Sequence, residues 1–298
     1  MSLIQGIVNR HNSFDGSVQH LLMTPFNVKR QVRAGAAPQR ASVEWLKNRI
    51  VLFRTYCLPS VVSQSCRDFK WLIFVDDQTP SVYLDEIEEM LGSDPRFILI
   101  KCSEWSSEML RQSVILHSRF GADWLLTTRL DNDDGIAVDF VERLHEGIVF
   151  NKQSFLNFPD GVLLFNKMTF LYRHRSNAFL SFFEPISHPK TVWCIAHEQA
   201  GEVAPVLQLH GRPAFLQVVH GGNVSNKTRG FRVDRRVAVL PFWSGLREVI
   251  ESDTSAESRL EIIGFNLRYY FFWTVRDFAA RTFRRWQRRL LMLISGGK

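Results

Sequence analysis

Residues 124–134 read WLLTTRLDNDD, an apolar run followed at once by a cluster of acidic side chains. The run Trp124–Thr128 carries no charge, which is typical of a buried strand in a parallel sheet, where both faces are covered. A second such pair stands earlier in the chain, where Trp71–Val75 leads into Asp76 and Asp77. Both acidic clusters therefore fall at the carboxyl end of a predicted strand, the edge at which parallel sheets bind their ligands.

Strands and helices are predicted to alternate over residues 18–150. Strands are expected at Val18–Met23, Trp71–Val75, Arg96–Ile100 and Trp124–Thr128, and helices at Val43–Ser63, Ser81–Leu91, Glu104–Phe120 and Ile136–Phe150. In the first of these helices, Ser42 is placed as the N-cap, and Pro59 is expected to kink or end the helix. The alternation predicts an α/β fold, with a central, mainly parallel sheet flanked by helices.

The pattern changes after residue 150. Further strands are expected at Ser154–Phe158, Gly161–Tyr172 and Ala214–Val219, and the segments between them are irregular and rich in His and Pro. The chain has no internal repeat and no low-complexity linker. We therefore expect one continuous α/β domain over residues 1–264, followed by a basic amphipathic helical tail over residues 265–298.

Composition and charge exclude several classes of protein. Of the 298 residues, 45% are apolar and 22% charged, which is typical of a globular protein and excludes a disordered or fibrous one. The formal net charge of +7 lies wholly in residues 266–298, which hold eight Lys or Arg and one Asp. Since the rest of the chain is neutral, nucleic-acid binding is not expected. The four cysteines lack C-x-x-C spacing, and neither a signal peptide nor a membrane-spanning run is recognised, so a cytoplasmic protein with reduced thiols is expected.

The acidic cluster after Thr128 is the first candidate site. Asp131, Asp133 and Asp134 would repel one another strongly if they were buried and unpaired. A divalent cation would relieve this repulsion, and Mg²⁺ or Mn²⁺ prefers carboxylate oxygens while bridging phosphates. His220, which follows the strand at Ala214–Val219, could complete the metal site. The alternative is a solvated acidic turn that caps the following helix.

Other residues at the predicted strand ends are candidates for contacts with a nucleotide. Asp76 and Asp77 could bind a base or ribose, as acids do in nucleotide folds, or could cap the next helix. Gly221, in the sequence His220-Gly221-Gly222-Asn223, would let the backbone approach a phosphate closely. The chain has no Walker loop, G-x-G-x-x-G or G-x-S-x-G motif, and Gly201 stands where a zinc protease would carry its second His.

Several segments, taken in order, resemble the putative rhamnosyltransferase family of bacterial glycosyltransferases. They are Trp45–Phe53, Tyr56–Gln64, Phe69–Pro80, Thr128–Asp134, Asn177–Glu184, Thr191–His197 and Leu216–Asn223. The resemblance covers roughly residues 18–228 and implies a GT-A-like fold, with a donor half at about 18–150 and an acceptor half at about 151–264. It also implies a nucleotide-sugar donor, a Mn²⁺ or Mg²⁺ ion, and donor contacts from Asp76, Asp77, Arg129, Asp131, Asn132, Gly221 and Asn223. One departure is Thr24-Pro25 before Phe26-Asn27, where the family pattern leads us to expect an Arg.

The chemistry of glycosyl transfer assigns further roles. A metal held by Asp131, Asp133, Asp134 and His220 would neutralise the charge that grows on the leaving diphosphate, and Arg129 would add a charge-assisted contact. An inverting enzyme also needs a base for the acceptor hydroxyl, and Glu184, Asp160 and Glu198 are the candidates in that order. The alternatives are a nucleotidyltransferase-like enzyme and an inactive carbohydrate-binding protein. A nucleotidyltransferase would carry a glycine-rich basic loop after the first strand, whereas no glycine follows here until Gly35.

The tail suggests an anionic partner. On a helix over Phe271–Ile294, apolar side chains fall on one side and most of the arginines on the other. Such a helix could lie in a membrane interface and hold the enzyme at the inner face of the cytoplasmic membrane, beside a glycan or glycolipid acceptor. Packing on the body and an oligomer contact are the alternatives.

Overall fold

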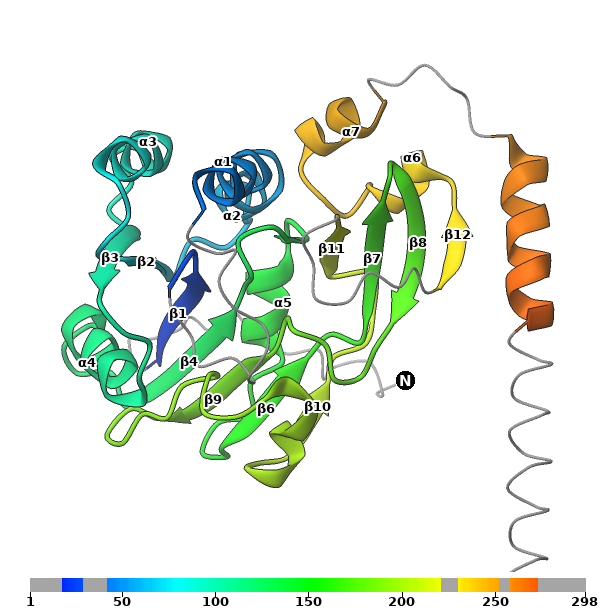
Figure 1. The fold of residues 1–298 in the computed structure, drawn as a ribbon. Helices are drawn as coiled ribbons and strands as arrows, with labels where there is room; N and C mark the ends of the chain where they lie inside the picture. The colour runs from blue at the N-terminus through cyan, green and yellow to red at the C-terminus, as the bar shows by residue number, and fades with distance from the viewer. Residues whose placement is uncertain (1–17, 29–41, 221–229, 252–257, 273–298) are drawn as a thin grey trace, which may run out of the picture.

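The computed structural model describes residues 18–28, 42–220, 230–251 and 258–272. Its strands form two sheets, one with the order β10-β6-β9-β4-β1-β2-β3 and the other with the order β12-β8-β7-β11-β5. Figure 1 shows helices packed along the sheets, with α1, α2 and α5 close to the region where the two sheets approach each other. The expected α/β class is confirmed, although the strands divide between two sheets where a single central sheet was expected.

The parallel half of the fold agrees with the sequence pattern. Its strands are β1 (Val18–Pro25), β2 (Lys70–Asp76), β3 (Phe97–Cys102) and β4 (Trp124–Arg129). All three of their neighbour pairings are parallel, with β1 between β4 and β2. Parallel pairing brings the carboxyl ends of β1, β2 and β4 to one edge of the sheet, as the sequence predicted.

Helices connect these strands, and the first helical stretch contains a π-helical turn. They are α1 (Val43–Leu52), α2 (Leu58–Val62), α3 (Ser81–Leu91), α4 (Ser107–His117) and α5 (Phe140–Glu146). The predicted cap is confirmed, because Ser42 Oγ accepts a hydrogen bond of 3.2 Å from the Trp45 N–H. The helix does not end at Pro59. A π-helical turn, η2 (Phe53–Cys57), lies directly before α2, and Pro59 is the second residue of α2.

The helix expected to start at Ile136 starts four residues later. Gly135–Ile136 instead forms the short strand β5, which pairs antiparallel with β11 (Phe215–Val219). A side chain at Gly135 would lie within 3.3 Å of the Tyr56 carbonyl and 3.2 Å of the Trp243 ring, so the backbone approaches both closely. The segment after the acidic cluster is therefore held in the second sheet before α5 begins.

The second half contains more strands than the sequence suggested. The elements are β6 (Ser154–Asn157), β7 (Asp160–Phe165), β8 (Met168–Arg173), β9 (Ser181–Pro185), η3 (His197–Glu202), β10 (Val206–Gln208), β12 (Phe231–Val233), α6 (Arg235–Ala238) and α7 (Ser244–Glu251). The single strand expected over Gly161–Tyr172 is a hairpin of β7 and β8. Asn166 and Lys167 have φ values of 45° and 64°, which is the left-handed conformation of a two-residue hairpin turn.

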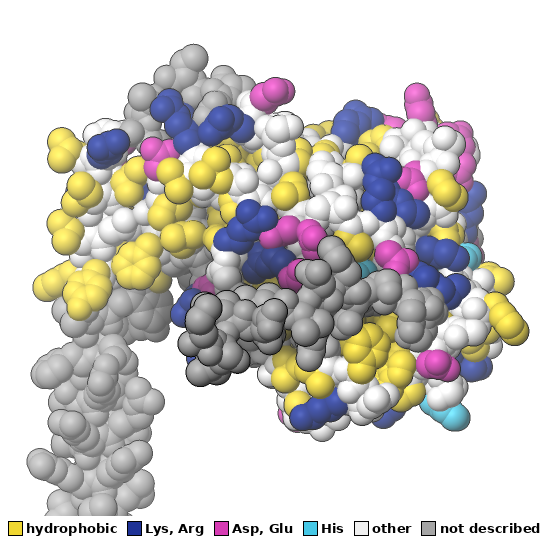
Figure 2. All heavy atoms as spheres, turned by 180° about the vertical axis from the view of Figure 1, so that it is seen from behind, with side chains coloured by type: hydrophobic (Ala, Val, Ile, Leu, Met, Phe, Trp, Pro, Cys, Tyr) yellow, Lys and Arg dark blue, Asp and Glu magenta, His cyan; other side chains and the backbone are white. Residues whose placement is uncertain are grey.

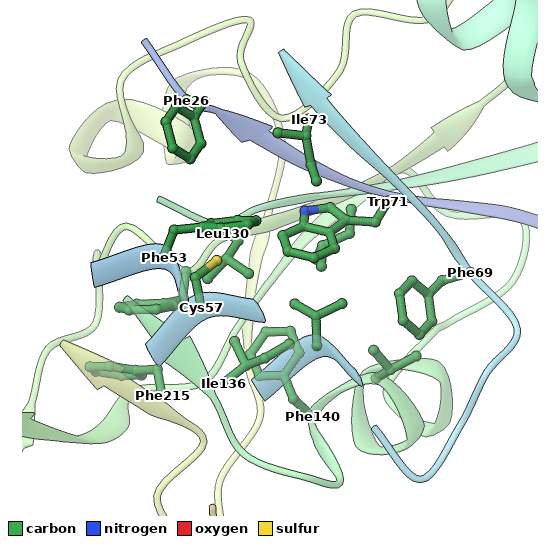
Figure 3. Packing of buried hydrophobic residues seen from close by; sticks show 14 of the residues in the cluster. Phe26, Phe53, Cys57, Phe69, Trp71, Ile73, Leu130, Ile136, Phe140 and Phe215 are labelled. Carbon is green, nitrogen blue, oxygen red and sulfur yellow. The ribbon is translucent and has the colours of Figure 1, made fainter. Parts of the chain in front are cut away.

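The largest apolar core lies between α1, η2, α2 and the strands (Figure 3). Trp71 is fully buried at its centre, 5.5 Å from Phe53 between ring centroids, and donates its indole N–H to Thr24 Oγ1 at 2.9 Å. The cluster also includes Phe215 of β11, which stacks on Phe179 at 4.5 Å. Because Phe215 belongs to the second sheet and Trp71 to the first, one core joins both sheets.

The tail is described only in part. A helix covers residues 259–272, so it begins before the expected boundary at residue 265, and residues 273–298 lie outside the described part of the chain. Figure 1 shows this helix in orange, standing beside β12 at the end of the second sheet. Within the described residues, no helix combines the length and the apolar character that crossing a membrane requires.

Candidate functional site

Two asparagines tie together the carboxyl ends of β1, β2 and β4. The side chain of Asn27 accepts a hydrogen bond from the Asp76 N–H at 3.0 Å and donates one to Thr79 Oγ1 at 2.8 Å. The side chain of Asn132 donates to the Phe26 carbonyl at 2.8 Å. The two acidic clusters are thereby held at one edge of the sheet. Asn27 was not among the candidate residues, although it lies only two residues after the end of β1.

Asp133 is the centre of the candidate site. It is almost fully buried, and its Oδ2 lies 2.5 Å from Arg49 Nη1 and 2.8 Å from His220 Nε2. Arg49 Nη1 also donates to Asn132 Oδ1 at 3.1 Å, and its guanidinium lies 5.0 Å from the centre of the Trp45 ring. Three elements thus meet on one carboxylate: α1, the loop after β4, and the end of β11.

The structure thus brings two of the predicted metal ligands, Asp133 and His220, within hydrogen-bond distance of each other. Arg49 was not among the candidate residues. Its signal in the sequence was its place in Trp45–Phe53, a segment of the family resemblance, and its position one helical turn after Trp45.

Asp134 points into the protein body. Its Oδ1 accepts a hydrogen bond of 2.8 Å from the Val218 N–H, two residues before His220. Burial raises the pKa of Asp134 well above its usual value, and the nearby charges of Asp133 and Asp131 raise it further. Asp134 thus joins the acidic loop to β11 and thereby helps to place His220.

Arg129 and Asp131 form a second charged group beside the first. Arg129 Nη2 donates to Asp131 Oδ2 at 2.8 Å, and the guanidinium lies 4.4 Å from the centre of the Trp193 ring. Trp193 in turn packs edge-on against Trp105 at 5.2 Å. Two arginines, from α1 and from the end of β4, therefore accompany the aspartates of this loop.

The residues proposed as catalytic bases lie in three different places. Glu184 on β9 pairs with Leu125, four residues, or about 13 Å along the strand, before Arg129. Its carboxylate is 1% exposed and accepts hydrogen bonds from the N–H groups of Lys190 (3.0 and 3.1 Å) and Thr191 (2.8 Å). Burial raises the pKa of Glu184 to about 7. The structure thus shows Glu184 anchoring a turn, away from the acidic loop.

The other two candidates, Asp160 and Glu198, have different partners. Asp160 begins β7 and forms a two-point ion pair with Arg173, at 2.6 and 2.9 Å. Since β7 runs parallel to β11, Asp160 lies at the strand end opposite His220. Glu198 is exposed and lies 3.3 Å from His197 Nε2. Burial lowers the pKa of His197, and the charge of Arg129 lowers it further.

The aspartates after β2 differ from each other. Asp76 is buried, and its Oδ1 accepts a hydrogen bond of 2.9 Å from the Gln78 N–H, so it shapes its own turn. Asp77 is exposed, with Oδ1 3.0 Å from Gln78 Nε2. Pro80, not either aspartate, occupies the N-cap position of α3. Gly221 and Asn223 lie outside the described residues.

A divalent cation at this site would need carboxylate or imidazole side chains that converge on one point. Within the described ranges, no group of three or more His, Cys, Asp or Glu side chains is arranged to hold a metal ion. Asp133 and His220 do converge, and Mg²⁺ is usually held by one or two protein carboxylates together with substrate phosphates. The pair therefore fits a cation that takes its other ligands from a diphosphate and water. Arg49 lies on the same carboxylate oxygen and would have to withdraw from it.

Comparison with known proteins places the chain in a family. A sequence model described as putative rhamnosyl transferase matches residues 20–232. No curated protein matches the chain. One solved structure that resembles it is S. aureus TarS 1–349 in complex with UDP-GlcNAc, with 11% identity, a TM-score of 0.37, and coverage of 69% of this chain and 60% of that chain. Another is the inositol-1-phosphate CTP transferase from T. maritima, with 8% identity, a TM-score of 0.35, and coverage of 79% of this chain and 98% of that chain. The chain thus spans about 60% of the length of the TarS segment.

The family match contains nearly all of the geometry described above. Residues 20–232 hold Arg49, the Asp131–Asp134 loop, His197 and His220, whereas the helix at residues 259–272 and the segment after it lie beyond the match. The match covers well over half of the 298 residues. This protein therefore belongs to the family described as putative rhamnosyl transferases, a family of glycosyltransferases.

Proposed function

We propose that this protein transfers a sugar from a nucleoside-diphosphate donor to a hydroxyl group of a glycan or glycolipid. The observation that carries the proposal is the meeting of Arg49, Asp133 and His220 at the carboxyl ends of parallel strands, where such sheets bind ligands. Membership of the glycosyltransferase family supports the reaction class. For rhamnose as the transferred sugar, the support is the description of the family and no structural observation.

The charges at the site suit a diphosphate. Arg49 and Arg129 both carry guanidinium groups, which bind phosphate oxygens in a two-point fashion, and His220 adds a ring nitrogen beside Asp133. In the proposal these groups hold the leaving diphosphate and stabilise the negative charge that develops as the glycosidic bond breaks. Asp77, exposed after β2, binds the base or the ribose, and Asp76 keeps the turn in shape.

The proposal includes a divalent cation, Mn²⁺ or Mg²⁺, held by Asp133 and His220. When bound, such an ion would supply positive charge to the diphosphate oxygens. Asp131 would join it only if Arg129 turned towards the phosphates, since the two now form an ion pair. Asp134 is placed as the support of the loop because its carboxylate already binds the Val218 N–H.

Glu198 is the proposed base for the acceptor hydroxyl. Its carboxylate is exposed, so an acceptor can reach it, and it lies beside His197, whose pKa is lowered by burial and by the charge of Arg129. His197 Nδ1 donates to the Ser176 carbonyl at 2.6 Å, which directs the other ring nitrogen towards Glu198. Glu184 and Asp160 are less suited, because their carboxylates are engaged by backbone N–H groups and by Arg173.

We also propose that residues 266–298 hold the enzyme on the anionic inner face of the cytoplasmic membrane, where a glycolipid acceptor would be available. The support is the charge of this segment, with eight basic residues and one acidic residue. A basic residue near an anionic leaflet contributes on the order of 1 kcal/mol of binding free energy.

The reaction class is tested with the purified full-length protein and a panel of UDP-, GDP- and dTDP-sugars, dTDP-rhamnose included. The assay follows release of the nucleoside diphosphate, with added Mn²⁺ or with EDTA. We expect turnover with one donor, its loss in EDTA, and its loss in Asp133→Asn but not in Asp68→Asn, a control whose ion pair with Arg119 lies elsewhere. Release of pyrophosphate from a nucleoside triphosphate and a sugar phosphate would instead identify a nucleotidyltransferase. Binding of a nucleotide sugar without turnover would identify an inactive binding protein.

A further inference from the structure

The helix at residues 259–272 is fixed to the body by one face. The side-chain amide of Asn266 accepts a hydrogen bond from the Arg232 N–H and donates one to the Arg232 carbonyl, both at 2.8 Å. Arg232 lies in β12, which is the last strand of its sheet. Asn266 therefore pairs with the open edge of β12 much as the backbone of a further strand would.

Aromatic side chains complete this inner face. Tyr269 Oη accepts a hydrogen bond from the Gly230 N–H at 3.1 Å, and its ring packs edge-on against Phe231. Phe265 lies 5.4 Å from Phe170 of β8, between ring centroids. The helix consequently has a defined rotation about its axis, which decides the side chains that it turns outward.

The opposite face is also apolar, and its large side chains are mostly exposed to solvent. At about 100° per residue, the outward side chains form one stripe, and each of them leaves between 54% and 79% of its surface exposed: Leu260, Ile263, Leu267, Tyr270 and Phe271. Figure 2 shows hydrophobic side chains gathered at the left edge of the molecule, where the chain leads into the grey segment. Five large apolar side chains in one stripe are more than the scattered exposure that is usual for a protein surface.

Charge decides between the partners that could cover this stripe. Arg268 is exposed beside it, and residues 273–298, which follow at once, contain seven basic residues and one acidic residue. A second copy of this chain would bring a second segment of the same sign alongside the first. An anionic lipid surface would instead attract both, and aromatic residues such as Tyr270 and Phe271 suit the interface of a bilayer.

We infer that the outer face of this helix, made by Leu260, Ile263, Leu267, Tyr270 and Phe271, inserts into the interface of an anionic membrane. The inference rests on the membrane association proposed for residues 266–298 and adds the surface that makes the contact. Because Asn266 fixes the helix against β12, the contact also orients the enzyme, with the β12 edge of the second sheet nearest the lipid. The active site is thereby held at a set angle to lipid-linked acceptors.

The test is flotation of the full-length protein with vesicles of phosphatidylglycerol and phosphatidylcholine. The face variant carries Leu260→Ser, Leu267→Ser and Phe271→Ser. The matched control carries Val82→Ser, Leu116→Ser and Phe120→Ser, three apolar side chains elsewhere on the surface that are each at least 63% exposed. We expect the face variant to bind at least about tenfold more weakly, a change that corresponds to about 1.4 kcal/mol, and the control to bind like the wild type. Circular dichroism of both variants checks that they fold.

A charge variant distinguishes this inference from the more general proposal that residues 266–298 bind the membrane. Arg284→Glu with Arg285→Glu lowers the charge of the tail and leaves the stripe intact. If the charge variant loses binding while the face variant floats like the wild type, the tail binds lipid and the inferred face is wrong. If the wild type itself does not float with anionic vesicles, both proposals fail. If the wild type forms a dimer that the face variant abolishes without loss of flotation, the stripe is a self-association surface and the inference is overturned.

Discussion

Replacing Arg49 with Met tests the central geometry of the site. The change removes a buried ion pair with Asp133 and a hydrogen bond with Asn132. The two charged side chains are only 12% and 8% exposed, and removal of one partner from a buried pair costs about 3–5 kcal/mol, because the other charge stays behind. His220 remains on the same Asp133 oxygen and offsets part of this loss. We therefore expect the free energy of unfolding to fall by about 3 kcal/mol.

The assay is urea denaturation of the single variants Arg49→Met and Asp133→Asn and of the double variant. Since both single changes break the same pair, the double variant should lose little more than either of them. A matched control is Arg54→Met, one turn further along, where the pair with Glu86 is exposed and should contribute less than about 1 kcal/mol.

The same variant has a second readout in binding. Loss of a charged donor to the diphosphate should weaken nucleoside diphosphate binding by about 1.5–3 kcal/mol in a calorimetric titration. If Arg49→Met proves as mild as Arg54→Met, or if the losses of the two single variants add up in the double variant, then Arg49 and Asp133 do not act as a pair and the reasoning fails.

Three further predictions follow from the other groups. Asp77→Ala should weaken nucleotide binding by about 1–3 kcal/mol in calorimetry, and an unchanged titration would remove Asp77 from the site. Glu198→Gln should lower kcat about 10²–10⁴-fold, as loss of a general base does. Glu184→Gln should instead lower the melting temperature, because the Glu184 carboxylate binds two backbone N–H groups. The reverse pattern would identify Glu184 as the base. Burial lowers the pKa of His20 well below its usual value and that of His145 to about 4, so the unfolded state binds protons first as the pH falls. The free energy of unfolding should then fall by roughly 3 kcal/mol for His145 alone between about pH 6.5 and pH 4, and a flat profile in urea titrations would contradict this.

The sequence alone was sufficient for the parallel half of the fold. Short apolar runs such as Trp71–Val75 are local features, and their alternation with helical segments restricts the topology to a parallel sheet. Pro59 was expected to kink or end the helix over Val43–Ser63; a π-helical turn precedes it, and the helix continues to Val62. Where no local signal marked a turn, the prediction was wrong. Asn166 and Lys167 form a turn without Gly, so the pattern did not reveal the hairpin.

The site was predictable only as far as strand ends reveal it. The Asp131–Asp134 loop follows its strand directly, so its place at the sheet edge could be inferred. The contact of His220 with Asp133 spans 87 residues, and that of Arg49 with Asn132 spans 83, so both depend on how β11 and α1 pack. Likewise, the sequence does not reveal that the Glu184 carboxylate accepts hydrogen bonds from the backbone N–H groups of Lys190 and Thr191.

The helix at residues 259–272 shows the same division. The sequence predicted a helical tail only from residue 265, and periodicity alone cannot choose between two apolar faces. The tertiary structure decides which face turns inward, because the Asn266 side chain pairs with the open edge of β12. A polar side chain that satisfies both backbone groups of an edge residue fixes the rotation of the helix. The physical reason is that unpaired backbone groups at a sheet edge favour a partner, whereas burial of apolar surface has no preferred direction.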